Sequence, residues 1–215
     1  MLIDLHSHTW PASDDSVLDP DQLIERSKAA GIDAVCLTEH NTFWDPARVD
    51  ALSRKHGILV LPGCEVTTDE GHMLVFGLHQ YDFGMFHIRR LVAMVSAADG
   101  AMVAAHPYRR QMPWYPDKPD QYEDALERAG RREAYKHVAA LETENGRGTP
   151  QENEFSHRLA TRLQLPETAG TDSHALVDIA RCATYFESDV KTVDDLIREL
   201  KTGRFHPLAL KGARA

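Results

Sequence analysis

Short apolar runs alternate along the chain with longer stretches in which apolar residues recur at helical spacing. In the stretch 86–98, for example, Ile88, Leu91, Val92 and Val95 would lie on one face of a helix. The pattern predicts strands at 2–5, 34–38, 58–61, 73–78, 101–105, 138–141 and 182–186, and helices at about 20–31, 46–56, 86–98, 153–163 and 193–201. Alternation of this kind favours an α/β fold in which helices cover parallel strands.

One segment breaks the alternation. Residues 108–132 are polar, rich in proline and aromatic, with Trp114, Tyr115 and Tyr122. We interpret them as an elaborated loop over the active site, with a helix inside it, rather than as a second domain. The length of 215 residues also suits a single domain spanning 1–215.

Composition and charge limit the possible partners. The formal net charge of −9 argues against broad binding of nucleic acid or of an acidic membrane surface. A small anionic substrate is still compatible with it, because bound cations can reverse the charge locally. Cys36 and Cys182 lie in apolar runs and are expected to be buried free thiols. No leader or membrane-length apolar run is visible, so a cytoplasmic location is expected, and nothing indicates an oligomeric state.

Candidate metal ligands recur at the ends of the predicted strands. They are His6, His8, His40, Glu65, His106, Asp172 and His174, and His72 lies at the start of another strand. Functional sites of α/β folds lie at the carboxyl ends of their strands, so we expect these side chains to converge. A single histidine such as His72 would more often be an ordinary polar residue. The combination of motifs is what predicts a site.

The spacing within two of the motifs is consistent with metal binding. In an extended segment, residues i and i+2 point the same way, so His6 and His8 can face one cation, as can Asp172 and His174. Imidazole and carboxylate ligands suit zinc, manganese or iron. A carboxylate such as Glu65 can bridge two ions about 3.5–4 Å apart, an arrangement used in phosphoryl transfer.

Six segments resemble, in order, the motifs of the PHP family, named for the polymerase and histidinol phosphatase domain. They are Asp-Leu-His-Ser-His-Thr (4–9), Leu-Thr-Glu-His-Asn (37–41), Gly-Cys-Glu-Val (63–66), Gly-His-Met-Leu-Val-Phe-Gly (71–77), Ala-His-Pro (105–107) and Gly-Thr-Asp-Ser-His (170–174). The resemblance spans nearly the whole chain. It implies a distorted (β/α)7 TIM-like barrel that holds two or three divalent ions of manganese, zinc or iron.

The resemblance also implies which residues hold each ion. One ion would be surrounded by His6, His8, Glu65 and Asp172. Glu65 would bridge to a second ion, held also by His72 and His106. A third would be held by His40, His174 and an acidic residue after the first motif, for which both Asp14 and Asp15 are candidates.

These residues predict a metal-dependent phosphoester hydrolase, either a phosphatase or a phosphodiesterase. The substrate would be a small phosphorylated molecule or a nucleotide, attacked by a hydroxide that bridges two metals. Arg109 and Arg181 are candidates for binding phosphate oxygens, and His174 for protonating the leaving oxygen. Exposed ion pairs are the alternative for each arginine.

Other residues are candidates for the substrate pocket. Glu142 and Asn145 follow the strand 138–141, although Asn-Gly at 145–146 is also a common turn pair. Trp114 and Tyr115 could stack on a base or ring, or pack within the loop.

Three other functions compete with this prediction. A nuclease acting on short oligonucleotides needs little basic surface. A non-catalytic metal-binding regulatory domain is disfavoured because no obvious ligand is lost. Hydrolysis of C–N bonds, as in related metal-dependent amidohydrolases, is disfavoured because no lysine occupies a matching strand end.

Overall fold

The computed structural model describes residues 1–113 and 115–210, so Trp114 lies outside the described residues. In this part of the chain the α-helices are α1 (Pro20–Ala29), α2 (Pro46–His56), α3 (Ile88–Ala97), α4 (Pro119–Gly130), α5 (Pro150–Leu163) and α6 (Val193–Thr202). The strands are β1 (Leu2–Asp4), β2 (Ala34–Leu37), β3 (Leu59–Pro62), β4 (Cys64–Thr68), β5 (Gly71–Phe76), β6 (Ala101–Ala104), β7 (Ala140–Asn145), β8 (Glu167–Gly170), β9 (Cys182–Phe186) and β10 (Phe205–Ala209). Short 3₁₀ helices lie at η1 (Phe83–Phe86), η2 (Glu133–Lys136) and η3 (Leu176–Asp178).

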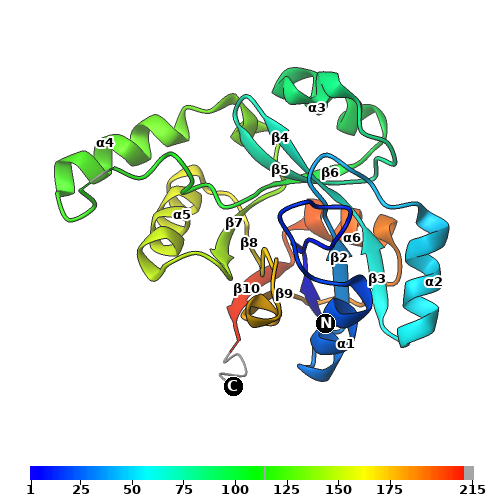
Figure 1. The fold of residues 1–215 in the computed structure, drawn as a ribbon. Helices are drawn as coiled ribbons and strands as arrows, with labels where there is room; N and C mark the ends of the chain where they lie inside the picture. The colour runs from blue at the N-terminus through cyan, green and yellow to red at the C-terminus, as the bar shows by residue number, and fades with distance from the viewer. Residues whose placement is uncertain (114, 211–215) are drawn as a thin grey trace.

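The strands form two five-stranded sheets, ordered β10-β9-β1-β2-β3 and β4-β5-β6-β7-β8 (Figure 1). In the first sheet, β1, β2 and β3 are parallel while β9 and β10 run antiparallel to their neighbours. In the second sheet, β6, β7 and β8 are parallel and β4 and β5 are antiparallel. The α/β class is confirmed, but the distorted (β/α)7 TIM-like barrel is not, because the strands form two mixed sheets.

The difference has a local cause. β4 and β5 are separated by two residues, and such a short connection can only join antiparallel strands. The segment 64–68 alternates apolar and polar residues over too short a length to stand out in the sequence. The sequence prediction also missed β10, which lies at the edge of the first sheet.

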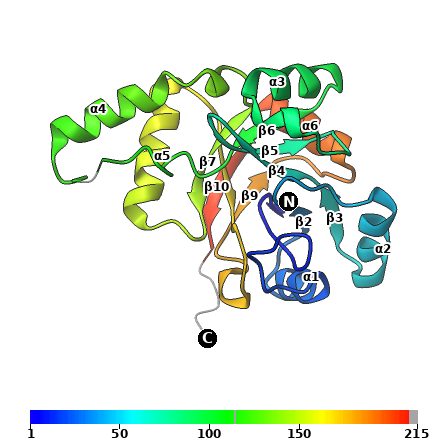
Figure 2. The same ribbon diagram turned by 45° about the horizontal axis from the view of Figure 1, so that its top comes forward.

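The two sheets face each other across a shared apolar core. Ile3 and Cys36 of the first sheet pack in it with Leu74 and Val103 of the second, and α6 closes it through Leu196. On the outside of the first sheet, α1 and α2 cover β2. On the outside of the second, α3 and α5 cover the strands, and α4 lies outside α5 (Figure 2).

The sheets meet at the ends of their strands. Isolated bridges pair His40 with Glu65 and Ser7 with Ser173. The Asp172 N–H also donates to the His6 carbonyl at 2.8 Å. The segments that carry the predicted ligands are therefore the same ones that join the two sheets.

Several boundaries agree with the sequence. Helix α2 and strand β9 have the predicted ends, and α1 begins at Pro20 with the Asp19 carboxylate as its N-cap. Cys36, Cys64 and Cys182 are buried free thiols. Within the described ranges 1–113 and 115–210, every helix is too short or too polar to cross a bilayer.

The segment 108–132 does contain the expected helix, which is α4. Its Tyr122 ring packs 5.5 Å from the ring of Phe155, so the helix lies against α5. Among the described residues of the segment, 108–113 and 115–132, Arg109 contacts the ligand cluster, through Asp172.

A substitution at Gly170 tests how closely β8 approaches the segment that extends β1. A Cβ atom there would lie 2.5 Å from the Cβ of His6 and 2.5 Å from Glu142 Oε1. We expect Gly170→Ala to lower the free energy of unfolding by about 1–3 kcal/mol, because a buried contact must be forced apart. Urea denaturation would measure the change.

Gly130→Ala is the matched control. A Cβ on Gly130, the last residue of α4, would meet Leu163 at an ordinary 3.6 Å. Its stability should stay the same or rise slightly, because alanine suits a helix better than glycine. Equal losses in the two variants would show that the approach at Gly170 is not tight.

Candidate metal centre

The predicted ligands converge where the two sheets meet. His6 and His8 lie in the segment that extends β1, and neither is exposed. Their Nε2 atoms are 3.0 Å apart, as expected for residues i and i+2 of an extended segment. The second sheet contributes Glu65 from β4, and Asp172 follows β8.

Four of these side chains form a compact inner group. Its members are His6, His8, Glu65 and Asp172. The separations of the two histidine Nε2 atoms from Glu65 Oε2 and Asp172 Oδ1 are between 3.3 and 3.6 Å. Ligands about 2.1 Å from a tetrahedral ion would be about 3.4 Å from one another. The four distances between a histidine and a carboxylate therefore match the spacing of ligands around a tetrahedral ion.

The two carboxylates of the inner group support the same conclusion. Glu65 Oε2 and Asp172 Oδ1 are buried and have no hydrogen-bond partner within the described residues. His40 Nδ1 approaches Glu65 Oε2 to 2.9 Å, but without hydrogen-bond alignment. Buried carboxylate oxygens without partners are costly, and a cation among them would satisfy both. The residues present thus fit a divalent ion.

Glu65 also faces a second group through its other oxygen. Oε1 lies 2.8 Å from His72 Nδ1 and 2.8 Å from His106 Nε2. A single carboxylate therefore has one oxygen in each of two groups of ligands, which is the geometry that a bridging ligand requires.

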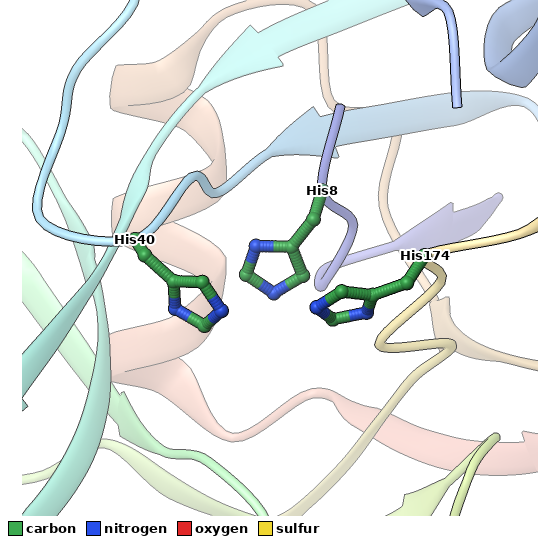
Figure 3. Close-up of side chains that lie close together, drawn as sticks. All are labelled: His8, His40 and His174. Carbon is green, nitrogen blue, oxygen red and sulfur yellow. The ribbon is translucent and has the colours of Figure 1, made fainter. Parts of the chain in front are cut away.

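A third, outer group lies nearer to solvent. Asp15 Oδ2 is 3.2 Å from the Nε2 atoms of both His40 and His174. Figure 3 shows the rings of His40 and His174 on either side of His8, whose ring centroid is 4.2 Å from that of His40 and 4.4 Å from that of His174. The side chain of Asp15 is 52% exposed, whereas those of the inner group are at most 1% exposed.

The structure favours Asp15 over Asp14 as the acidic partner of the outer group. Both residues are exposed. Only Asp15 contacts the histidines, and Asp14 makes no side-chain hydrogen bond or ion pair in residues 1–113 and 115–210.

The remaining ring nitrogens have partners that orient the histidines. His6 Nδ1 lies 2.9 Å from Glu142 Oε1, and His8 Nδ1 lies 3.2 Å from Ser13 Oγ. His174 Nδ1 lies 2.8 Å from the Asp172 carbonyl. With a proton on the Nδ1 atoms of His6 and His8, the Nε2 lone pairs of these two residues face the cluster and are available to a metal.

Electrostatics keeps the carboxylates of the cluster ionised. Burial alone would raise the pKa of Glu65, but the histidines around it, His6 foremost, hold that pKa well below its usual value. His6 and His8 likewise overcome the effect of burial at Asp172 and lower its pKa. Asp4, which lies behind the cluster, differs: burial raises its pKa to about 6. Ionised carboxylates are the form that binds cations.

Glu142 and Asn145 do not line a pocket as predicted. Both are 1% exposed and lie within β7, which continues past the predicted end at residue 141. Glu142 Oε2 accepts hydrogen bonds from the His106 N–H and from Asn145 Nδ2, both at 2.9 Å. These residues contact the candidate ligands and hold them in place.

The two predicted arginines differ in their surroundings. Arg109 Nη2 lies 2.7 Å from Asp172 Oδ2, so Arg109 is at the cluster. The guanidinium of Arg181 instead donates to the carbonyls of Gly146 and Val177, away from the ligands. The structure brings in Arg147, whose Nη1 is 2.8 Å from His174 Nδ1. Arg147 lies two residues after the end of β7, so a search of the strand ends for cationic residues would have identified it from the sequence.

Two family models match the sequence. The model described as PHP domain matches residues 4–145, and the model described as PHP-associated matches residues 150–205. The uncharacterized protein MJ1587 of Methanocaldococcus jannaschii is 28% identical over 117 residues, which cover 50% of this chain and 68% of that protein.

Three solved structures share the fold. PsfC from Pseudomonas syringae has a TM-score of 0.64 and 20% identity, covering 98% of this chain and 91% of its own. A candidate metal-dependent phosphoesterase from Bifidobacterium adolescentis has a TM-score of 0.60 and 17% identity, covering 94% and 96%. An amidohydrolase from Chromobacterium violaceum, with bound sulfate and no metal, has a TM-score of 0.61 and 18% identity, covering 96% and 97%. Because the PHP model alone matches about two thirds of the sequence and its motif residues converge in one cluster, the chain belongs to the PHP domain family.

Proposed function

We propose that the protein hydrolyses phosphoesters of a small phosphorylated molecule or nucleotide at this metal centre. The observation that carries the proposal is the position of Glu65, whose two oxygens face two different groups of ligands. Divalent ions bound there would lower the pKa of water and neutralise phosphate oxygens. Manganese, zinc and iron all suit the imidazole and carboxylate donors.

The proposed ligand sets follow the three groups of side chains. The inner ion would be held by His6, His8 and Asp172, which lie close enough together to share one ion, with Glu65 Oε2 as the fourth ligand 3.3–3.4 Å from the two histidines. The second would be held by Glu65, His72 and His106. The outer ion would be held by Asp15, His40 and His174.

Two arginines at the edge of the cluster would bind the phosphate group. A guanidinium presents paired N–H donors that match two phosphate oxygens. The side chain of Arg109 is 40% exposed although one of its nitrogens contacts Asp172, so part of the group is accessible to a substrate. Arg147 lies beside His174, with Nη1 2.8 Å from Nδ1 of that histidine.

His174 is assigned here to ion binding rather than to proton transfer. Its Nε2 faces Asp15, and its Nδ1 is within hydrogen-bond distance of the Asp172 carbonyl. A nitrogen that binds an ion has no proton to give, so the role of proton donor, considered from the sequence, would require the outer position to be empty.

Turnover is tested first with the protein reconstituted with Mn²⁺. The substrate panel contains phosphomonoesters, nucleotides, a phosphodiester chromogen, a short oligonucleotide and a simple amide. We expect phosphate ester hydrolysis that a chelator abolishes. Glu65→Gln should reduce kcat by 100-fold or more and lower the metal content, because the bridging carboxylate is lost.

Full activity of Glu65→Gln would contradict the bridging role. Cleavage of the amide alone would indicate C–N hydrolysis, and release of mononucleotides alone would indicate a nuclease. A protein that binds metal but cleaves nothing would support the non-catalytic alternative.

Glu142 offers a test of how the ligands are held. Its Oε1 faces His6 Nδ1 and its Oε2 accepts from the His106 N–H, so the amide nitrogen of a glutamine would face a donor in either orientation. We expect Glu142→Gln to weaken metal binding by about 10–100-fold. Metal titration followed by elemental analysis would measure this. Glu127→Gln, at an exposed position of α4, is the control, and equal affinities in the two variants would contradict the role.

Arg147 is tested by substrate kinetics. We expect Arg147→Met to lower kcat/KM by about tenfold or more through the loss of a charged hydrogen bond to phosphate, with the metal content unchanged. Arg147→Lys should recover only part of the loss, since lysine cannot bind two oxygens with a planar group. Arg131→Met, at the exposed residue that directly follows α4, is the control. Unchanged kcat/KM in Arg147→Met would show that Arg147 does not bind the substrate.

A further inference from the structure

Glu39 is a buried carboxylate next to the cluster that belongs to none of its three groups. It is not exposed, and it precedes His40 at the end of β2. No lysine or arginine forms an ion pair with it among residues 1–113 and 115–210. A buried charge without a countercharge persists only where hydrogen bonds compensate it.

The carboxylate of Glu39 accepts four hydrogen bonds. Oε2 accepts from the Thr9 N–H at 2.8 Å and from the Ser13 hydroxyl at 2.6 Å. Oε1 accepts from the Thr9 hydroxyl and from Trp44 Nε1–H at 2.9 Å. Each oxygen therefore faces one N–H group, and an N–H group cannot reverse to become an acceptor. The position requires two acceptor oxygens, as in a carboxylate, and an amide cannot supply them.

These hydrogen bonds fix the loop that carries Asp15. The loop leaves the cluster at Thr9, and the Ser13 N–H donates to the Thr9 carbonyl at 2.8 Å. The Ser13 hydroxyl, besides donating to Glu39, accepts from the His40 N–H at 3.2 Å. Glu39 thus holds the loop against the end of β2. The point of attachment in the loop is Ser13, two residues before Asp15.

We propose that Glu39 is a positioning residue for the outer metal position. It holds the loop so that Asp15 reaches His40 and His174, and its loss weakens the outer ion selectively. The inner ligands are buried and are held by strands of both sheets, whereas Asp15 is half exposed and depends on its loop. Ser13 Oγ also lies 3.2 Å from Nδ1 of the inner ligand His8, but the main chain of His8 is held separately, because its N–H donates to the Ser173 carbonyl at 3.1 Å. The proposal rests on the proposed metal centre, but it does not depend on phosphoester chemistry.

The test is a titration of the metal-free protein with Mn²⁺, with bound metal measured after equilibrium dialysis. Asp15→Asn identifies the ion that depends on the outer ligand, by comparison with the unaltered protein. We expect Glu39→Gln to weaken that same ion about tenfold or more, and to leave the affinity of the more tightly bound ions within about threefold. No substrate is needed, so failure of the phosphoester proposal would show separately in the turnover assay.

A second substitution distinguishes positioning from general damage. In Glu39→Gln, the amide nitrogen can face the Thr9 hydroxyl without conflict once the donor of Trp44 is removed. The double variant Glu39→Gln/Trp44→Phe should therefore bind the outer ion more tightly than Glu39→Gln alone. Trp44→Phe alone should weaken it no more than about threefold. Thermal unfolding of each metal-free variant confirms that the fold is retained.

Three results would overturn the proposal. One is an unchanged affinity for the outer ion in Glu39→Gln. Another is equal weakening of all ions, which would show that Glu39 supports the whole cluster. The third is an unaltered protein in which no bound ion depends on Asp15, because no outer position would then exist.

Discussion

The carboxylate of Glu65 organises the centre of this protein. It is buried at the start of the second sheet, where a main-chain bridge pairs it with His40 at the end of the first sheet. An isolated carboxylate in such a place would be protonated or displaced, because burial disfavours its charge. Histidines on both sides keep it ionised instead. The charge of Glu65 therefore depends on the positions of the histidines around it.

Support for the ligands comes from a second layer of buried acids. Glu142 orients His6, Asp4 accepts from the His6 N–H at 3.2 Å and from Thr171, and Glu39 fixes the loop after His8. Each of these acids accepts hydrogen bonds from main-chain groups as well as from side chains. The geometry of the inner ligands is therefore set by the ends of the strands, whereas the position of Asp15 is set by the loop that Glu39 holds.

Much of the site was predictable from the sequence, because a histidine or acid at the end of a strand is visible without knowing how the strands pair. The choice between Asp14 and Asp15 was not, since adjacent residues of a loop differ only in the direction of their side chains. Glu142 and Asn145 were misplaced because β7 is longer than its apolar run. The two-sheet arrangement was missed because neither β4 nor β10 is a continuous apolar run: Glu65 interrupts β4, and His206 and Pro207 interrupt β10. Antiparallel pairing also depends on the length of the connection more than on composition.

The division into two sheets has a consequence for the stability of the fold. His6, His8 and His40 come from the first sheet, whereas Glu65, His72 and His106 come from the second, and within the described residues the main-chain ladders join the sheets only at isolated bridges. Any ion that binds this set is a cross-link between two halves of the molecule, and its binding free energy adds to the free energy that keeps them together. The candidate metal centre would then also stabilise the arrangement of the two sheets, and removal of the metal would lower the free energy of unfolding.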